Sequence, residues 1–287
     1  MEARVKLSGQ VGIVTGAGRG IGNGIALALA REGMDLVVTS RSGDELDELV
    51  ATIASAGGRA VAVVGDVAVQ SDVQRVVRTT IEELGPVDLL VNNAGRGPKR
   101  FCPLWEADMQ DWWDVLRVNL LGPAMGCHTV LPGMIARGCG RIVTIGSLTG
   151  ANPHPTFASY AVSKAALMRL GDSLALSLLG TGVLVFELNP GLVHTPALDA
   201  HPSVFGHIVE DDFTPVEVPA AAVVRIATGE LDALQGRVLD ASEDDFDDML
   251  ARVREIVALD ARTLRVRSYG PDDPLEVPVP PREAPVA

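Results

Sequence analysis

Cysteine is scarce in this sequence: 287 residues include only three, Cys102, Cys127 and Cys139. An odd number of widely spaced cysteines favours neither a disulfide framework nor a metal site. The five histidines also lack the spacing of metal ligands. We therefore expect reduced cysteines that serve as packing residues, and no bound metal.

Basic residues are also in short supply, because 24 lysines and arginines face 37 acidic residues, a formal net charge of −13. No basic stripe is visible along the chain, which argues against nucleic acid and anionic membranes as partners. The amino-terminal segment M-E-A-R-V-K-L-S-G-Q contains no apolar signal core, and no stretch approaches the length of a membrane span. The sequence thus predicts a cytoplasmic protein whose partner is a small molecule.

Apolar residues, in contrast, make up 47% of the chain and form alternating strand-like and helix-like segments. A chain of this length can bury a full core, and the alternation favours one α/β domain over two. Right-handed crossovers between the strands would give a parallel sheet covered by helices on both faces. We expect strands near residues 10–15, 34–40, 59–65, 87–91, 140–146, 182–189 and 236–241.

The most informative motif combines Ser147, Tyr160 and Lys164. Tyr160 and Lys164 lie four residues apart in a helix-like run, so both side chains share one helix face. A free phenol ionises near about pH 10 and is a poor base at neutral pH, but an adjacent ammonium group stabilises the phenolate. Ser147 ends the strand-like segment V-T-I-G-S, and its hydroxyl could bond a substrate oxygen while Tyr160 donates or accepts the proton. Taken alone, the Tyr-to-Lys spacing also fits a half-buried tyrosine followed by a solvated lysine.

A glycine-rich turn, T-G-A-G-R-G-I-G at 15–22, follows an apolar strand and precedes a helix-like stretch. Glycines let the backbone approach a pyrophosphate, and the amino end of a helix favours its negative charge. Asp66 and the segment Asn92-Asn93-Ala94-Gly95 each follow a strand, at the edge where open α/β sheets bind ligands. Asn119 lies in a mostly apolar helical pattern, which fits either a structural cap on backbone groups or a member of a proton relay.

In this order and at these intervals, the motifs resemble those of the short-chain dehydrogenase/reductase family over roughly residues 7 to 241. The resemblance implies a Rossmann-like doubly wound parallel sheet of about seven strands, and an oxidoreductase that uses NAD or NADP. It implies that Tyr160 is the acid/base, that Lys164 assists it and holds the nicotinamide ribose, that Ser147 orients the carbonyl and that Asn119 supports a proton relay. The cofactor contacts that it implies are Thr15, Gly16, Gly18, Gly20, Ile21, Gly22, Asp66, Val67, Asn93, Ala94, Gly95, Tyr160, Lys164, Pro190, Gly191, Val193 and Thr195.

Charge bears on the choice between the two dinucleotides. An NAD site places a carboxylate at the end of the second strand, whereas an NADP site needs cations there. The strand D-L-V-V-T-S-R ends in Ser40 and Arg41 with no acid in the expected place, and Arg19 could approach the same 2′-phosphate from the glycine turn. Because a planar guanidinium suits phosphate, the pattern favours NADP over NAD. If both arginines simply face solvent, Asp44 would fill the acid role from one turn later.

The residues that follow these motifs predict a substrate pocket formed by Arg96, His154, Phe157, Leu192 and His194. Basic residues near Arg96 could attract an acidic substrate, or they could simply face water. The leading function is an NADP(H)-dependent interconversion of a carbonyl and a secondary alcohol. The alternatives are a dinucleotide-binding sensor or scaffold without turnover, and a cofactor-assisted isomerase or dehydratase on the same fold.

The end of the chain departs from the family pattern, so we divide the chain into a Rossmann-fold domain, 1–241, and a C-terminal extension, 242–287. The apolar residues Phe246, Leu250, Val253 and Val257 recur at intervals of three or four and predict one acidic, amphipathic helix from about residue 242 to 259. A proline-rich tail from 271 to 287 follows, and we expect it to add little stability. The resemblance implies a homodimer or homotetramer. The altered ending weakens the case for a tetramer but leaves a dimer through the helices around residues 119 and 164.

Overall fold

The computed structural model describes residues 6–195, 198 and 209–267. Its centre is a seven-stranded sheet in the order β3-β2-β1-β4-β5-β6-β7, and every neighbouring pair is parallel. The strands are β1 (Val11–Thr15), β2 (Asp35–Ser40), β3 (Ala60–Val64), β4 (Leu89–Asn92), β5 (Gly140–Ile145), β6 (Val183–Asn189) and β7 (Val238–Asp240). The predicted Rossmann-like sheet and its seven strands are confirmed, because every predicted boundary lies within two residues of the observed one.

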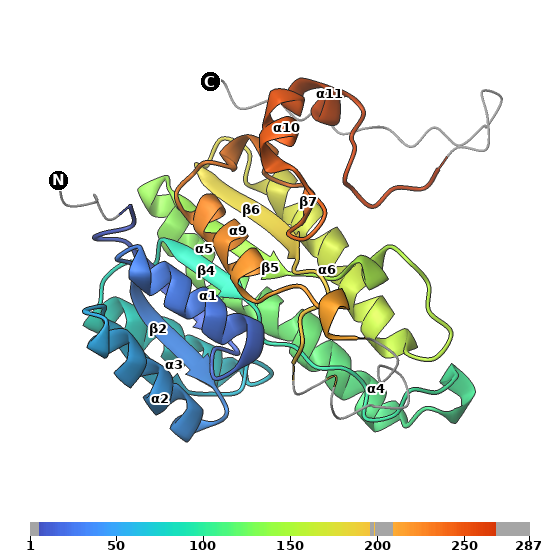
Figure 1. Cartoon of the computed structure of the whole chain (residues 1–287), viewed down its shortest axis with the longest axis horizontal. Helices are drawn as coiled ribbons and strands as arrows, with labels where there is room; N and C mark the ends of the chain where they lie inside the picture. Colours follow the sequence, from blue (N-terminus) through green and yellow to red (C-terminus); the bar gives the residue numbers. More distant parts are fainter. Residues whose placement is uncertain (1–5, 196–197, 199–208, 268–287) are drawn as a thin grey trace.

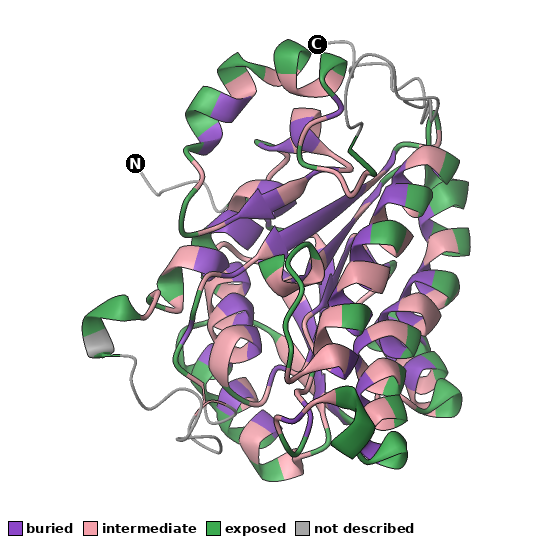
Figure 2. Ribbon diagram, turned by 90° about the vertical axis from the view of Figure 1, so that its right-hand side faces the viewer, coloured by how far each residue is buried: buried purple, intermediate pink, exposed green. Residues whose placement is uncertain are grey.

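Helices cover both faces of the sheet (Figure 1). Helices α1 (Gly20–Arg31), α2 (Gly43–Ser55) and α9 (Glu217–Ala227) contribute to one apolar core, and α3 (Gln70–Glu83), α5 (Gly122–Arg137) and α6 (Ala158–Ser177) contribute to the other. Figure 2 shows the result, with buried strands between helices that turn exposed residues outward. Apolar side chains thus alternate between two cores across one sheet, as the near-continuous apolar strands require.

Short elements complete the chain between these helices. Helix α4 (Met109–Leu116) packs beside α6 and runs into a π-helical turn, η2 (Arg117–Leu121), which leads directly into α5. The remaining turns are the 3₁₀ segments η1 (Leu104–Glu106), η3 (Leu148–Gly150), η4 (Glu210–Asp212) and η5 (Asp232–Leu234). The sequence pattern predicts a helix around residue 119 but gives no sign of the π turn.

The strand order reverses between β1 and β4, which pair in parallel although the intervening strands lie on the other side of β1. Such a switch point opens a crevice at the carboxyl ends of the strands, because the following loops leave toward opposite faces. The crevice therefore lies where the glycine turn follows β1 and where Asn92-Asn93-Ala94-Gly95 ends β4.

The helix predicted from about residue 242 to 259 is wrong in one respect, because two short helices replace it: α10 (Phe246–Ala251) and α11 (Val253–Ala258). The backbone at Arg252 (φ −105°, ψ 16°) leaves the helical range and ends the first helix. Phe246 and Met249 are buried against the body of the protein, and Val253 packs against the same core. The spacing of the apolar residues identified the packed face correctly, but that spacing alone does not reveal where a helix is interrupted.

The described part of the extension is anchored to the last strand and to α6. The amide of Val238 donates to the carbonyl oxygen of Arg262 at 2.9 Å, so the chain covers part of the outer edge of β7. Arg237 and Asp260 form a buried ion pair at 2.7 Å. Arg265 continues the network, because its guanidinium contacts both Asp260 and Asp172 of α6. The proline-rich tail lies outside the described residues.

The cysteines fulfil the packing prediction in part. Cys102 and Cys127 are buried, and burial raises the pKa of the Cys127 thiol to about 11, so this thiol stays protonated at neutral pH. Cys139 is exposed, and the prediction is wrong there. It follows the left-handed Gly138 in the turn that ends α5, where no core surrounds it. Among the helices of the described segments, none combines the length and apolar character that crossing a bilayer requires.

Candidate active site

The crevice at the switch point is a cavity of about 780 Å³. One end is lined by the glycine turn and the end of β2, and the other by Ser147, Tyr160 and Lys164. Of the predicted cofactor contacts, the cavity wall includes Gly16, Gly18, Arg19, Gly20, Ile21, Ser40, Arg41, Asp66, Val67, Asn93, Ala94, Gly95, Tyr160, Lys164, Pro190, Gly191, Val193 and Thr195. Thr15, Gly22 and Asn119 are absent from that wall and lie behind it.

The glycine turn leaves room for a ligand because its backbone packs closely on the end of β4. Gly16 has a φ of 65°, and a Cβ atom there would lie 2.8 Å from the Cα of Ala94. A Cβ atom at Gly22 would overlap the amide nitrogen of the Asn93 side chain. Helix α1 begins at Gly20, so its free backbone amides point into the cavity. This cradle fits the pyrophosphate of a dinucleotide.

Thr15 and Asn93 hold the two sides of the crevice together. The hydroxyl of Thr15 donates to the carbonyl oxygen of Val91 at 3.2 Å and accepts the amides of Asn93 and Ala94 at 3.0 and 3.1 Å. The side-chain amide of Asn93 donates in return to the carbonyl oxygens of Thr15 and Gly16. These bonds fix the glycine turn against β4, and they give Thr15 a structural task although it lies outside the cavity wall.

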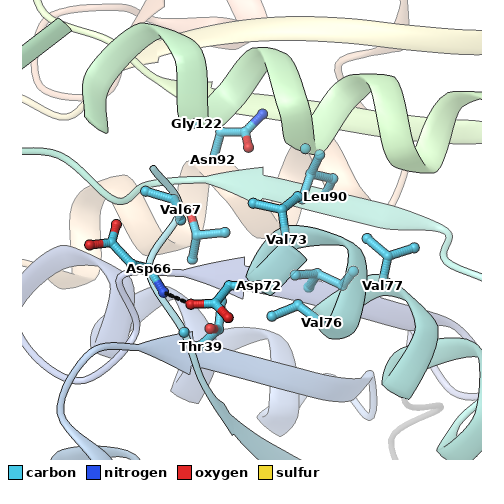
Figure 3. Close-up of a pocket in the computed structure, with 14 residues that line it drawn as sticks. Thr39, Asp66, Val67, Asp72, Val73, Val76, Val77, Leu90, Asn92 and Gly122 are labelled. Atoms are coloured by element: carbon cyan, nitrogen blue, oxygen red, sulfur yellow. Dashed lines mark hydrogen bonds between the residues drawn. The ribbon is translucent and has the colours of Figure 1, made fainter. Parts of the chain in front are cut away.

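Asp66 and Val67 form the wall beyond the end of β3 (Figure 3). The amide of Asp66 donates to the carboxylate of Asp72 at 3.0 Å, and the Asp66 carboxylate accepts the amide of Ala68 at 2.9 Å. In Figure 3 the Asp66 carboxylate points away from the valine side chains of α3 that floor a small cavity underneath. Asp66 is therefore oriented by its own loop, with its side chain available to a ligand in the larger cavity.

The end of β2 presents both signs of charge to the cavity. Arg41 is exposed and forms no ion pair within the described segments, whereas Arg19 lies 4.0 Å from a carboxylate oxygen of Glu45. Glu45 lines the cavity beside Gly18, but Asp44 is exposed and does not. Sequence reasoning considered Asp44 and missed Glu45. The burial pattern of α2 could have identified Glu45. Residues 46, 49 and 53 of this helix are buried, and Glu45 lies one helical turn before one of them, whereas Asp44 does not.

Tyr160 and Lys164 lie one turn apart on α6 at the inner end of the cavity. The Nζ atom of Lys164 lies 5.5 Å from the centroid of the Tyr160 ring and donates a hydrogen bond to the carbonyl oxygen of Ile145 at 2.8 Å. Lys164 is buried, and no carboxylate of the described residues forms an ion pair with it. A buried ammonium beside a phenol stabilises the phenolate form. The pair can therefore exchange a proton with a ligand oxygen.

Ser147 follows β5 and caps the short η3 turn. Its Oγ atom accepts the amide of Thr149 at 3.3 Å and donates to the Thr149 hydroxyl at 3.0 Å. The η3 turn packs tightly on α6, because a Cβ atom at Gly150 would lie 2.6 Å from the backbone of Lys164. The loop and the helix therefore place Ser147, Tyr160 and Lys164 on one wall of the cavity.

Asn119 lies in the π turn η2 and is almost completely buried. Its side chain donates to the carbonyl oxygen of Arg96 at 2.9 Å and to the hydroxyl of Ser163 at 3.0 Å, and it accepts the amide of Arg96 at 2.8 Å. Ser163 in turn donates to the carbonyl oxygen of Tyr160. These contacts favour the structural cap among the two sequence hypotheses for Asn119, because its amide is used in joining the loop after β4 to α6.

The predicted substrate pocket divides into residues that line the cavity and residues that lie outside its wall. Arg96, Phe157 and Leu192 line it. The ring of His154 packs on Phe157 at a centroid distance of 3.8 Å, and His194 packs on Phe213 at 4.8 Å, so neither histidine forms the cavity wall. Those two assignments find no support in the cavity wall, because both side chains are exposed and each packs on a neighbouring ring.

Phe101 adds to this end of the cavity, and Asp111 holds Arg96 in place. Phe101 lines it and makes an edge-on contact with Phe157 at 5.2 Å. The guanidinium of Arg96 is paired with the buried carboxylate of Asp111, which also accepts the amide of Lys99 at 2.8 Å. Sequence reasoning missed Phe101, since a lone aromatic in a loop has no pattern that distinguishes it. Within the described ranges, no group of three or more possible metal ligands occurs.

Comparisons with known proteins agree with this geometry. The family model for short chain dehydrogenases matches residues 10–203. A short chain dehydrogenase of Pseudocercospora fijiensis is 39% identical over 192 residues, which is 66% of this chain and 62% of that relative. This chain therefore spans less than two thirds of the relative's length.

Two solved structures are similar over most of the chain. A 7α-hydroxysteroid dehydrogenase complexed with NADH and 7-oxo glycochenodeoxycholic acid has a TM-score of 0.77 at 29% identity, and the match covers 83% of this chain and 94% of that one. An actinorhodin polyketide ketoreductase variant with NADPH has a TM-score of 0.76 at 30% identity, covering 80% and 95%.

This protein belongs to the short-chain dehydrogenase/reductase family. Its fold is that of the dehydrogenase and the ketoreductase described above.

Proposed function

We propose that the protein is an NADP(H)-dependent oxidoreductase that interconverts a carbonyl and a secondary alcohol, with Tyr160 as its acid/base. The observation that carries this proposal is the position of Lys164. It is buried within 5.5 Å of the Tyr160 ring, on the same cavity wall, without an ion pair to a carboxylate among the described residues. A charge in this position acts on the phenol, because a buried cation is screened far less than an exposed one.

The nicotinamide, when bound, would supply or accept the hydride. In the direction of reduction, Tyr160 would donate its phenolic proton to the carbonyl oxygen, and Lys164 would stabilise the phenolate that remains. Ser147, on the same wall, would donate a hydrogen bond to the substrate oxygen. Asn119 would hold α6 at a fixed distance from the loop that follows β4. The proton donor and the cofactor cradle would then keep their relative position.

The preference for NADP over NAD rests on Arg41 and Arg19 at the end of the cavity. Arg41 is exposed there without an ion pair among the described residues, which leaves its guanidinium free for a 2′-phosphate. Glu45 acts against this preference, because its carboxylate lies near Arg19 and would repel a phosphate. We propose that the two arginines outweigh it, which makes Glu45 the residue that limits the preference.

The walls around the reacting end indicate the kind of substrate. Phe101, Phe157 and Leu192 provide apolar surface, whereas Arg96 is engaged by Asp111 and is less available to an anion than the sequence suggested. We propose a ketone with an apolar body as substrate. The same proposal includes a cytoplasmic location, no nucleic-acid or membrane partner, and a domain boundary at residue 241. It also includes a homodimer or homotetramer, with the dimer contact formed by the helices around residues 119 and 164.

The test is oxidation of NADPH and NADH with a panel of ketones and aldehydes, followed by the reverse assay with secondary alcohols. We expect NADPH-dependent reduction of at least one apolar ketone. Tyr160→Phe should lower turnover by roughly 100-fold or more while dinucleotide binding stays intact. Near-normal turnover in that variant would refute the assignment of Tyr160, and isomerisation or dehydration without net change in the cofactor would refute the redox reaction.

A further inference from the structure

A buried glutamate lies behind the proposed acid/base pair. Glu187 belongs to β6, between Thr144 of β5 and Val238 of β7, and its side chain is 5% exposed. A Cβ atom at Gly146 would lie 2.8 Å from its Cγ atom, and one at Gly171 would lie 3.9 Å from Oε2. The carboxyl group therefore occupies the space between the end of β5, directly before Ser147, and the α6 helix that carries Lys164.

This carboxyl group has no hydrogen-bond partner at Oε1 within the described structure. Buried polar atoms are normally bonded, so an unpartnered carboxyl oxygen in the interior calls for a reason. Packing does not provide one, since an apolar side chain would fill the same space without a desolvation cost.

The charged groups around Glu187 are Lys164 and Asp172 on α6, Arg237 before β7 and Arg262 in the extension. Arg237 is paired with Asp260, Arg262 with Asp244, and Asp172 with both Arg169 and Arg265. Lys164, in contrast, donates only to the carbonyl oxygen of Ile145 among the described residues. Of the described charges around Glu187, Lys164 is thus the one that no ion pair neutralises.

We propose that Glu187 is a positioning residue for the acid/base pair: it acts through Lys164 and sets how much of the lysine's positive charge reaches Tyr160. This role rests on the proposed function, in which Tyr160 is the acid/base. A neutral carboxyl leaves the full charge of Lys164 for the phenolate. An ionised carboxylate shares that charge and makes the phenolate less stable.

The environment makes both states accessible near neutral pH. Burial raises the pKa of Glu187 to about 8, and Lys164 lowers it in part. The C-terminal extension contributes to this burial, because residues 262–264 close the far side of the small cavity next to Glu187. The C-terminal extension therefore influences the proposed acid/base pair by helping to bury the carboxyl group of Glu187.

The composition of the chain allows a direct test. It contains two tyrosines, Tyr160 and Tyr269, so the Tyr269→Phe protein has Tyr160 as its single tyrosine. The absorbance of tyrosinate can then be followed against pH in the full chain, with and without Glu187→Gln. We expect the titration of Tyr160 to move to lower pH by about half a unit or more in Glu187→Gln, because no carboxylate then competes for Lys164.

Three controls make the result specific. Glu255→Gln, which removes an exposed carboxylate on α11, should leave the titration unchanged. Glu187→Met provides a second variant of similar volume if Glu187→Gln is poorly folded. In a Lys164→Met background the effect of Glu187→Gln should largely disappear, because Glu187 is proposed to act through the charge of Lys164.

Superimposable titrations with and without the Glu187→Gln substitution, or a shift to higher pH in the variant, would overturn the proposal. The measurement needs no substrate, so it separates two failures. A protein that reduces no ketone but shows the shift would contradict the proposed function alone. A protein that reduces ketones but shows no shift would contradict only the role of Glu187.

Discussion

Lys164 is tied to Ile145 by a hydrogen bond of 2.8 Å from its Nζ atom to the backbone carbonyl oxygen. The bond spans from α6 to the last residue of β5, immediately before Gly146 and Ser147. It fixes the ammonium group at the point where the strand that positions the serine ends. The lysine therefore depends on the sheet for its position, and not on α6 alone.

From this position we predict that Lys164→Met lowers turnover and also weakens dinucleotide binding, because one side chain serves both tasks. Tyr160→Phe should lower turnover alone. Titration calorimetry with NADPH, together with kcat and KM for the ketone found in the panel, separates the two variants. Unchanged dinucleotide affinity in Lys164→Met would remove its role toward the ribose.

Substitutions of Arg41 and of Glu45 should shift the preference between NADPH and NADH in opposite directions. Arg41→Asp should remove a charge-assisted contact worth about 1.5–3 kcal/mol and add a repulsion, so preference should move toward NADH by at least about tenfold. Glu45→Gln should move it further toward NADPH, because the carboxylate near Arg19 is removed. Dissociation constants for NADPH and NADH decide both. If the unaltered protein already binds the two equally, the arginines are surface residues and Glu45 becomes the candidate for the ribose hydroxyls.

Glu187 should also make the stability of the protein depend on pH. Its pKa is raised from 4.5 to about 8 in the folded state, so folding is unaffected below about pH 4.5, where the group is protonated in both states. Between these values the unfolded chain loses the proton and the folded chain retains it. Stability should therefore fall as pH rises to about 8, by an amount on the order of 4 kcal/mol.

Glu187→Gln removes this dependence but leaves a buried amide, which costs a similar amount at every pH. The informative quantity is therefore the slope. Urea denaturation at a series of pH values should show that the difference in unfolding free energy between Glu187→Gln and the unaltered protein grows in favour of the variant from about pH 4.5 to 8. A constant difference would mean that Glu187 is not protonated in the folded protein.

The ion pair of Arg237 with Asp260 should be a main anchor of the extension. Arg237→Met leaves a buried carboxylate that has lost one of its two cationic neighbours, and we expect a loss of about 3 kcal/mol in unfolding free energy. Arg252→Met, which removes an exposed pairing with Glu255, is the matched control and should change stability very little. Equal effects would show that the buried pair does not anchor the segment.

The sequence was sufficient for the sheet and for much of the cavity wall, because strands with a continuous apolar pattern and glycines at a strand-to-helix turn have few alternative structures. It was less informative where function depends on which way a side chain turns. Glu45 differs from Asp44 by a rotation about α2, and His154 and His194 lie outside the cavity wall, where each packs on a neighbouring ring. Glu187 was invisible for the same reason: an acidic residue in an apolar strand is recognised as buried and unpartnered only when its neighbours from α6 and β5 are known.

Because Gly146 and Glu187 fit tightly together, the order in which the two residues can be substituted is limited. A side chain at position 146 would enter space that the Cγ and Cδ atoms of Glu187 already occupy. Replacing Glu187 by a smaller residue first creates room, and a change at Gly146 can then follow; the reverse order passes through a strained intermediate. In redesign or in evolution, Glu187 therefore keeps position 146 a glycine for as long as the glutamate itself is retained.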